Sequence, residues 1–289
     1  MCAAGFGRSH RALLASLVLI MSFCLTPRDA AAADAAVPPA TKVRLEFDGH
    51  VLAGFLYKPE GEGPWPALLW NHGSEKNPGK GAQFGTVASV FVPAGYVVFA
   101  PERRGHGESE GDYIVDQTKL TARVRGGDAA NRQGVHLLET EQLRDQLAGL
   151  AFLQKLPYVD HEKIVVAGCS FGGIETLLGA ESRAGYKAAV SISPGALSWE
   201  RNDYLRSRLI QAVRRMQIPV LIIQPAHDAS LGPSRVLGRE AKSAGTPVTT
   251  KVYPATGPEK EQEHCFGGAS GMHVWADDAK AFLEAQLSR

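Results

Sequence analysis

"IVVAGCSFGGIETLLGAE", residues 164–181, joins three kinds of sequence in one short stretch. Its first residues form a continuous apolar run, which is typical of a strand buried on both faces in a parallel sheet. Its last residues have the pattern of a helix. Between them lies a glycine-rich turn, Gly168-Cys169-Ser170-Phe171-Gly172, which fits the pattern G-x-S-x-G. The stretch therefore predicts a strand, a sharp turn and a helix in immediate succession.

The turn contains two candidate nucleophiles, Cys169 and Ser170. In a nucleophile elbow the middle residue is strained so that its side chain is exposed, and glycines on either side leave room for the turn. Ser170 has Gly168 and Gly172 in those places. The same frame around Cys169 would need glycines at 167 and 171, where this chain has other residues. We therefore predict Ser170 as the nucleophile, against the alternative that the pattern arose by chance in a glycine-rich turn.

The rest of the chain repeats the alternation of apolar runs and helical segments. "KVRLEFDG" and "HVLAGFLYKP" alternate in polarity and predict an antiparallel hairpin that turns at Asp48-Gly49. A hairpin followed by strand–helix units predicts a single α/β domain with a mostly parallel, doubly wound sheet. Further strands are expected at 66–73, 96–102, 163–170, 188–193, 219–228 and 248–254, and helices at 139–156, 172–182, 206–216, 234–245 and 275–287.

Two connections bear on access to the predicted site. Residues 111–136 form the one long stretch without a clear pattern, and we expect an irregular loop there, either functional or a surface excursion without a role. The connection at 194–205 is short, which leaves little room for a large cap domain and favours an open cleft.

A serine nucleophile needs a base and a group that orients the base. On a sheet of this kind the expected chain order is Ser, then Asp or Glu, then His. Asp228 ends the apolar run at 219–228 and is the predicted acid, although it could instead cap a helix. Two histidines follow it. We favour His264, in a glycine-rich loop, over His273, which lies close to the start of the last helix.

The oxyanion that forms during acyl transfer needs two N–H donors. The residue after the nucleophile, Phe171, begins the predicted helix and supplies the first. The second is expected from the loop "NHGSEKNPGKG" (71–81), which follows a buried strand, and Ser74 is our candidate. His72 precedes the nucleophile in the chain, and we expect it to brace this loop.

The chain resembles a known group of enzymes, the α/β-hydrolase superfamily, and within it the dienelactone hydrolase family. The resemblance covers about residues 42–288. It is carried by the "HGS" loop, "PERRGHGESEG" (101–111), "GCSFGG", the aspartate after the next-to-last strand, and "EHCF" before the last helix. It implies the same roles for Ser170, Asp228, His264, Ser74 and Phe171. Dienelactone hydrolases have Cys where this chain has Ser170, so the lactone substrate is not implied. The serine-bearing relatives are expected to be esterases or acyl-transferring peptidases.

Arg103 and Arg104 lie in "PERRGHGESEG", at the end of a predicted buried strand. Either guanidinium could bind a substrate carboxylate through two hydrogen bonds, so both are possible substrate-binding residues. The alternative, which we favour, is that they brace the neighbouring loops.

Cys169 and Cys265 adjoin the predicted nucleophile and base. If those two groups meet, the sulfurs come near each other, but disulfide geometry is strict. We expect two small buried thiols, with a disulfide as the alternative. No Cys-x-x-Cys pair and no cluster of histidines and cysteines at metal-ligand spacing occurs in the sequence, so no metal or other cofactor is expected.

The first 36 residues have the pattern of a secretory signal peptide and leader. Arg8, His10 and Arg11 precede the apolar run 12–25, and a stretch rich in alanine follows. The run is too short for a transmembrane helix. We expect cleavage after Ala33 or Ala36, export to the periplasm or the medium, and a catalytic domain over residues 37–289. The alternative is a retained N-terminal anchor.

The composition limits the class of partner. The formal net charge is +1 over 289 residues, with no stripe of lysines and arginines, so nucleic-acid binding is not expected. The sequence predicts a serine hydrolase that cleaves small-molecule carboxylic esters. The alternatives are a secreted serine peptidase of the prolyl-oligopeptidase type and, from another class, a binding protein on the same fold. No feature of the sequence predicts an oligomeric state.

Overall fold

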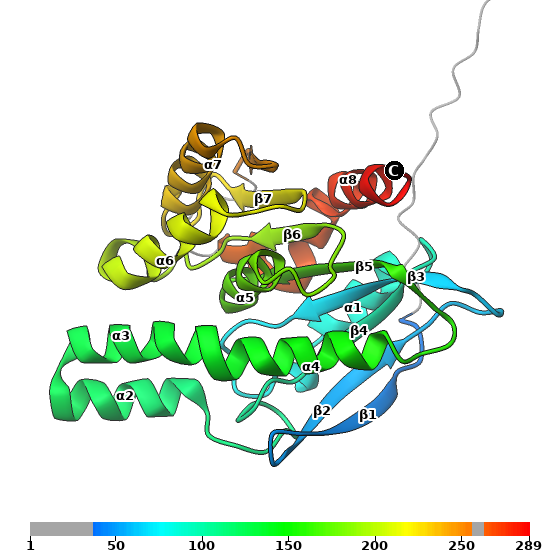
Figure 1. The fold of residues 1–289 in the computed structure, drawn as a ribbon, viewed down its shortest axis with the longest axis horizontal. Helices are drawn as coiled ribbons and strands as arrows, with labels where there is room; N and C mark the ends of the chain where they lie inside the picture. The colour runs from blue at the N-terminus through cyan, green and yellow to red at the C-terminus, as the bar shows by residue number, and fades with distance from the viewer. Residues whose placement is uncertain (1–36, 256–262) are drawn as a thin grey trace, which may run out of the picture. The chain divides into compact units, whose positions relative to one another are not determined.

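A computed structural model of the chain describes residues 37–255 and 263–289. The predicted signal peptide and leader, residues 1–36, lie outside the described residues. The described residues form one sheet flanked by helices on both faces (Figure 1). This is the predicted α/β architecture.

The sheet has the strand order β1-β2-β4-β3-β5-β6-β7-β8. β1 pairs with β2, and β2 with β4, in antiparallel fashion, whereas all the remaining pairs are parallel. The strands of the described residues are β1 (Thr41–Phe47), β2 (His50–Tyr57), β3 (Trp65–Asn71), β4 (Val97–Pro101), β5 (Val159–Cys169), β6 (Ala189–Ile192), β7 (Val220–Pro225) and β8 (Val248–Tyr253).

The helices form two layers, one on each face of the sheet (Figure 1). Side chains from α4 to α7 share one hydrophobic core, and side chains from α1 and α8 share the other. The helices of the described residues are α1 (Gln83–Phe91), α2 (Ile114–Arg125), α3 (Gly127–Leu137), α4 (Leu143–Leu153), α5 (Phe171–Glu181), α6 (Asp203–Arg214), α7 (Gly238–Ala244) and α8 (Ala276–Leu287). The central strands are buried on both faces, which is why their sequences are apolar without alternation.

The predicted N-terminal hairpin is present. Phe47 pairs with His50, and the two residues between them, Asp48 and Gly49, have φ of 55° and 76°. Two successive residues with positive φ favour Asp-Gly at this turn. The hairpin adds the antiparallel edge to an otherwise parallel sheet.

The prediction of an irregular loop at 111–136 was wrong. The stretch contains α2 and α3, which pack against each other side by side, with Gly126 between them at a φ of 84° (Figure 1). A π-helical turn, Leu138–Gln142, then leads from α3 into α4. Only Ile114 of α2 is buried, so the hydrophobic periodicity that would reveal a helix is nearly absent. The glycine pair at 126–127 separates two helices.

Sequence reasoning also missed α1. Its buried residues are Phe84, Val87, Ala88 and Phe91, which is the i, i+3, i+4, i+7 spacing of an amphipathic helix. That signal was present in the sequence. As predicted, no large cap follows β6, because the chain reaches α6 through one short 3₁₀ helix, Trp199–Arg201.

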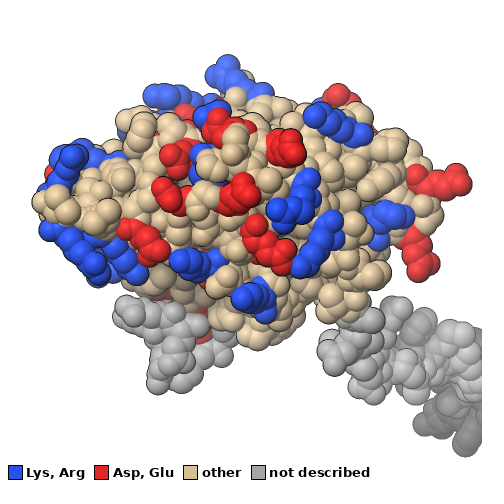
Figure 2. Space-filling view, turned by 90° about the horizontal axis from the view of Figure 1, so that it is seen from below, with Lys and Arg blue, Asp and Glu red and all other residues tan. Residues whose placement is uncertain are grey.

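Acidic and basic side chains are interspersed over most of the face shown in Figure 2. Basic side chains gather at the end formed by α2 and α3, where Lys119, Arg123 and Arg125 are exposed. No helix among the described residues is both long enough and apolar enough to cross a membrane.

Candidate active site

Ser170 occupies the junction between β5 and α5, as the sequence predicts. Its φ of 58° and ψ of −115° lie in a region that residues with side chains rarely adopt. Its backbone N–H donates to the carbonyl of Ile192 at 2.9 Å, which ties the turn to the neighbouring strand β6. A strained residue fixed in this way is a common feature of functional sites.

Close backbone contacts explain the two glycines of the turn. A Cβ on Gly168 would lie 2.5 Å from the carbonyl oxygen of Asn71, and a Cβ on Gly172 would lie 2.0 Å from the same atom. Both distances are far inside van der Waals contact. The end of β3 therefore leaves no room for a side chain at either position, and the turn needs both glycines.

His264 and Asp228 meet at the carboxyl edge of the sheet. The Nδ1 atom of His264 lies 2.7 Å from Oδ1 of Asp228. The same oxygen accepts the backbone N–H of Ala229 at 2.8 Å, and Oδ2 accepts the side-chain amide of Gln224 at 2.8 Å. The carboxylate is fully buried, and three donors surround it. Such an arrangement holds an imidazole in one orientation.

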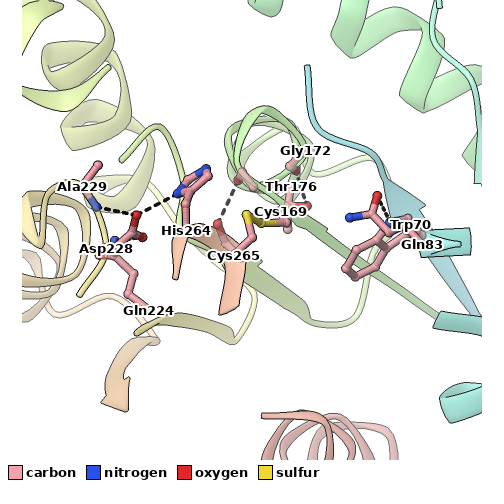
Figure 3. Close-up of a disulfide and its surroundings, with 12 residues drawn as sticks. Trp70, Gln83, Cys169, Gly172, Thr176, Gln224, Asp228, Ala229, His264 and Cys265 are labelled. Carbon is pink, nitrogen blue, oxygen red and sulfur yellow. Dashed lines mark hydrogen bonds and ion pairs between the residues drawn. A yellow bond between two sulfur atoms is a disulfide. The ribbon is translucent and has the colours of Figure 1, made fainter. Parts of the chain in front are cut away.

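The other ring nitrogen of His264 is available for chemistry. Nε2 is buried and forms no hydrogen bond within the part of the chain that the structure describes. Figure 3 shows the ring between Asp228 and the chain segment that carries Cys169. His273, the alternative base, is exposed, and its Nδ1 contacts the carbonyl of Ser270 at 2.9 Å. The geometry thus favours His264.

The two predicted oxyanion donors lie in different elements. Phe171 is the first residue of α5, where backbone N–H groups have no acceptor within the helix. Ser74 is half-buried in the connection after β3, and its carbonyl accepts a hydrogen bond from the hydroxyl of Tyr113. Tyr113 directly precedes α2, so the α2–α3 hairpin begins beside this loop.

Arg103 braces the loop that carries Ser74. Its Nη2 donates to the carbonyls of His72 and Gly73 at 3.0 and 2.9 Å, and its Nε donates to Gln142 at 3.1 Å. The backbone N–H of Arg103 also donates to Nε2 of His72 at 3.2 Å. Arg103 is 0% exposed, and its contacts are those expected from the interpretation favoured above, that it braces the neighbouring loops. The prediction that His72 braces the loop agrees with these contacts.

Arg104 is likewise buried and paired. Its guanidinium forms a two-pronged ion pair with Asp145 of α4, with a shortest distance of 2.7 Å, and also contacts Asp48. The Asp145 carboxylate accepts the backbone N–H of Arg104 as well. These contacts are likewise those expected of a bracing residue, because they hold the β4 connection to α4 and to the hairpin.

Several ionisable groups below the site are electrically neutral near pH 7. Burial, together with the nearby Arg103 charge, lowers the pKa of His72 well below its ordinary value and that of His106 to about 3. Burial raises the pKa of Glu175, on α5, to about 8. Both carboxyl oxygens of Glu175 are buried without a hydrogen-bond partner among the described residues. No sequence pattern singled out Glu175; only its position on a buried helix face could have done so.

Cys169 and Cys265 form a disulfide, with their Cα atoms 6.0 Å apart (Figure 3). The expectation of two free thiols was therefore wrong. The bond joins the residue before Ser170 to the residue after His264. Each cysteine adjoins a residue of the predicted site, but the sequence alone did not place the two in the geometry that a disulfide needs. The described residues contain no group of three or more His, Cys, Asp or Glu side chains that could hold a metal ion.

A model of the X-Pro dipeptidyl-peptidase (S15) family matches residues 48–246. The chain belongs to this family. As an S15-family chain with this sheet and this elbow, it is an α/β hydrolase.

Two relatives of this S15-family chain are 26% identical to it. One is the quorum-quenching protein AidA of Acinetobacter baumannii, matched over 54% of this chain and 45% of that protein. The other is the uncharacterized peptidase YtmA of Bacillus subtilis, matched over 74% of this chain and 86% of that protein. The chain thus spans less than half of AidA but most of YtmA.

Solved structures of both esterases and peptidases share the fold of this chain. Est1E from Butyrivibrio proteoclasticus, with bound ferulic acid, is 19% identical with a TM-score of 0.63, over 86% of this chain and 100% of that chain. The Pyrococcus furiosus esterase Pf2001 is 15% identical with a TM-score of 0.62, over 86% and 93%. The Pyrococcus horikoshii acylaminoacyl peptidase is 19% identical with a TM-score of 0.62, but the chain spans only 42% of it.

Proposed function

We propose that this α/β hydrolase is a serine esterase that cleaves small carboxylic esters through an acyl-enzyme intermediate. The observation that carries the proposal is the elbow at Ser170, strained between β5 and α5 and joined by a disulfide to the segment that carries His264, whose ring pairs with Asp228. A strained serine and an oriented imidazole with a free Nε2 are the parts that nucleophilic catalysis needs.

The reaction follows from these positions. His264 Nε2 takes the proton of the Ser170 hydroxyl as its oxygen attacks the ester carbonyl, and Asp228 stabilises the imidazolium that forms. The N–H groups of Phe171 and Ser74 bind the oxyanion of the tetrahedral intermediate. His264 then returns the proton to the leaving alcohol. Water, activated by the same imidazole, hydrolyses the acyl-serine.

Two observations support an ester as the substrate. The esterases Est1E and Pf2001 correspond to this chain over 100% and 93% of their own lengths. Est1E was solved with ferulic acid, a small aromatic acid, which supports a small-molecule substrate here. The resemblance to dienelactone hydrolases supports this proposal in one respect only, that the substrate is an ester.

A peptidase is the second candidate function. The matching family model is that of X-Pro dipeptidyl-peptidases, and YtmA is named a peptidase. The same nucleophile, base and oxyanion donors would attack a peptide carbonyl. Activity on an X-Pro-nitroanilide, beside activity on esters, separates the two candidates.

The test compares wild type with Ser170→Ala on short-chain nitrophenyl esters, with Ser207→Ala, an exposed serine of α6, as the matched control. We expect turnover by wild type and the control and background rates for Ser170→Ala. Labelling of wild type, but not Ser170→Ala, by a fluorophosphonate is expected as well. Equal hydrolysis by wild type and a folded Ser170→Ala would rule out Ser170 as the nucleophile. Faster cleavage of X-Pro-nitroanilides than of any ester would favour the peptidase.

Export of the chain is a further part of the proposal, and it rests on the sequence of residues 1–36. The mature protein is expected to begin at Asp34 or Val37. Mass spectrometry of the protein from the periplasm or medium of an expressing bacterium tests this. An intact N-terminus in a membrane fraction would instead show a retained anchor.

A further inference from the structure

We propose that the Cys169–Cys265 disulfide positions the base of this enzyme, so that catalysis depends on its being formed. The inference rests on the proposed function of His264. The disulfide joins the segments that carry Ser170 and His264, at one residue from each. Any separation of the two sulfurs would change the distance between the nucleophile and the base.

The two ends of the disulfide differ in rigidity. Cys169 is the last residue of β5, 4% exposed, and its strand pairs with β3 on one side and β6 on the other. It therefore provides a fixed point in the centre of the sheet. Cys265 belongs to no strand and lies in the connection between β8 and α8. The disulfide ties this connection to the sheet.

The connection that carries His264 has an unfavourable backbone. Cys265, Phe266, Gly267 and Gly268 all have positive φ, at 56°, 59°, 70° and 76°. This conformation raises the free energy of residues other than glycine, and consecutive residues rarely adopt it. Such a segment keeps its shape only where its surroundings hold it.

The stretch His264–Val274 packs against α1, β7 and α8, and three side-chain contacts hold it near His264. The Phe266 ring is buried and packs edge-on against Tyr253, with the ring centroids 5.3 Å apart. The His264 side chain bonds to Asp228. The disulfide is the covalent contact of the three, and it acts at the residue next to the base. We infer that it selects the strained conformation in which His264 pairs with Asp228.

Reduction reverses this constraint. A dithiol reductant breaks the S–S bond, gives two electrons and two protons to form the thiols of Cys169 and Cys265, and becomes a disulfide itself. The elbow keeps its own strand, helix and glycine contacts, so the nucleophile stays in place. The expected defect is a base that no longer lies at the nucleophile, which lowers kcat and leaves KM nearly unchanged.

The experiment uses the oxidised full-length mature protein and the double variant Cys169→Ala/Cys265→Ala, each at a temperature where circular dichroism shows it folded. We expect kcat for the ester to fall at least tenfold in the double variant, with KM within about twofold of wild type. Dithiothreitol should reduce the kcat of wild type to the same extent, and reoxidation should restore it. The double variant is the control, because dithiothreitol should leave it unchanged.

A second readout does not require turnover. The proton shared by His264 Nδ1 and Asp228 is expected to give a low-field ¹H NMR signal in oxidised wild type, assigned by its loss in Asp228→Asn. We expect this signal to weaken or vanish on reduction. A folded, reduced protein that keeps either the signal or wild-type kcat would overturn the inference and leave the disulfide as a general stabiliser. Persistence of the signal alone would overturn it even if no ester proved to be a substrate, and that lack of turnover would count against the proposed function instead.

Discussion

The carbonyl oxygen of Asn71 lies 2.0 Å from the position that a Cβ on Gly172 would take. Asn71 ends β3 and Gly172 lies in the first turn of α5, so this contact determines how closely the elbow helix approaches the sheet. A Cβ is fixed by the backbone that carries it, and the carbonyl oxygen belongs to the backbone of β3. Neither atom could therefore rotate away, as the end of a flexible side chain could.

Gly172→Ala should therefore displace the elbow. We expect loss of esterase activity by a factor of 100 or more, together with a fall in Tm, because overpacking of this kind costs about 1–3 kcal/mol or more. Gly127→Ala is the matched control, since a Cβ there meets nothing within 4 Å. Wild-type activity in Gly172→Ala would show that β3 and α5 can separate without harm to the site.

His264 and His273 can be separated by single substitutions. His264→Ala should lower kcat by about 10⁶-fold, the loss expected when the base of such a triad is removed. His273→Ala, at an exposed position, should stay within about twofold of wild type. Steady-state kinetics on one nitrophenyl ester decide between them, and the reverse result would move the role of base to His273.

Arg103 should matter for the rate although it is fully buried. Arg103→Met removes the donor to the carbonyl of His72, at a cost of about 1–3 kcal/mol, and one donor to the carbonyl of Gly73, which keeps its contact with Nδ1 of His72. We expect a lower Tm and, in the folded variant at low temperature, a kcat reduced tenfold or more as the Ser74 loop shifts. Arg123→Met, at an exposed position on α2, controls for loss of charge. Unchanged kcat in folded Arg103→Met would show that the loop holds its place without the guanidinium.

Glu175 makes stability depend on pH. Burial raises its pKa in the folded protein to about 8, whereas the ordinary value is 4.5. Between these values the unfolded chain releases the proton and the folded protein keeps it. The free energy of unfolding therefore falls as pH rises, by about 1.4 kcal/mol per pH unit.

The window from pH 6.5 to 8 isolates this effect. Below pH 6.5, His72 and His106 act in the opposite direction to Glu175. Their pKa values are lowered in the folded protein, so the unfolded chain binds protons there that the folded protein does not, and the free energy of unfolding falls as pH falls. In urea titrations across the window, Glu175→Gln should lose less stability than wild type. Glu62→Gln, an exposed site, should behave like wild type. Parallel curves for wild type and Glu175→Gln would mean that Glu175 ionises normally.

The elbow and the sheet could be predicted because their signals are local. The apolar run before Ser170 and the two flanking glycines each have one physical explanation, a strand buried on both faces and a turn without room for a Cβ. The Asp-Gly pair at the hairpin is of the same kind. The proximity of His264 and Asp228 needed one further rule, that strand ends of a parallel sheet meet along one edge.

The other features depend on contacts between distant parts of the chain. α2 carries little hydrophobic periodicity because it packs chiefly against α3, and the buried Val135 and Leu137 of α3 lie only near its end, so the stretch was interpreted as a loop. Arg103 and Arg104 are buried because they bond to Gln142 and Asp145, which lie about 40 residues further along the chain. No local sequence pattern connects such distant residues. The disulfide between Cys169 and Cys265 needed the position of the His264 connection, which no rule of local sequence supplies.

The disulfide also changes what a protease can do to the chain. Residues 169–265 form a covalently closed ring that includes β6, β7 and β8. A single cut within that ring, for example after the exposed Arg183 in the turn that follows α5, leaves both fragments joined by the sulfur bridge. A nicked molecule would thus remain one covalent particle, with the nucleophile and the base still tethered to each other. If the chain is exported as proposed, this closed ring would delay loss of activity to proteases until a second cut or a reductant releases the fragments.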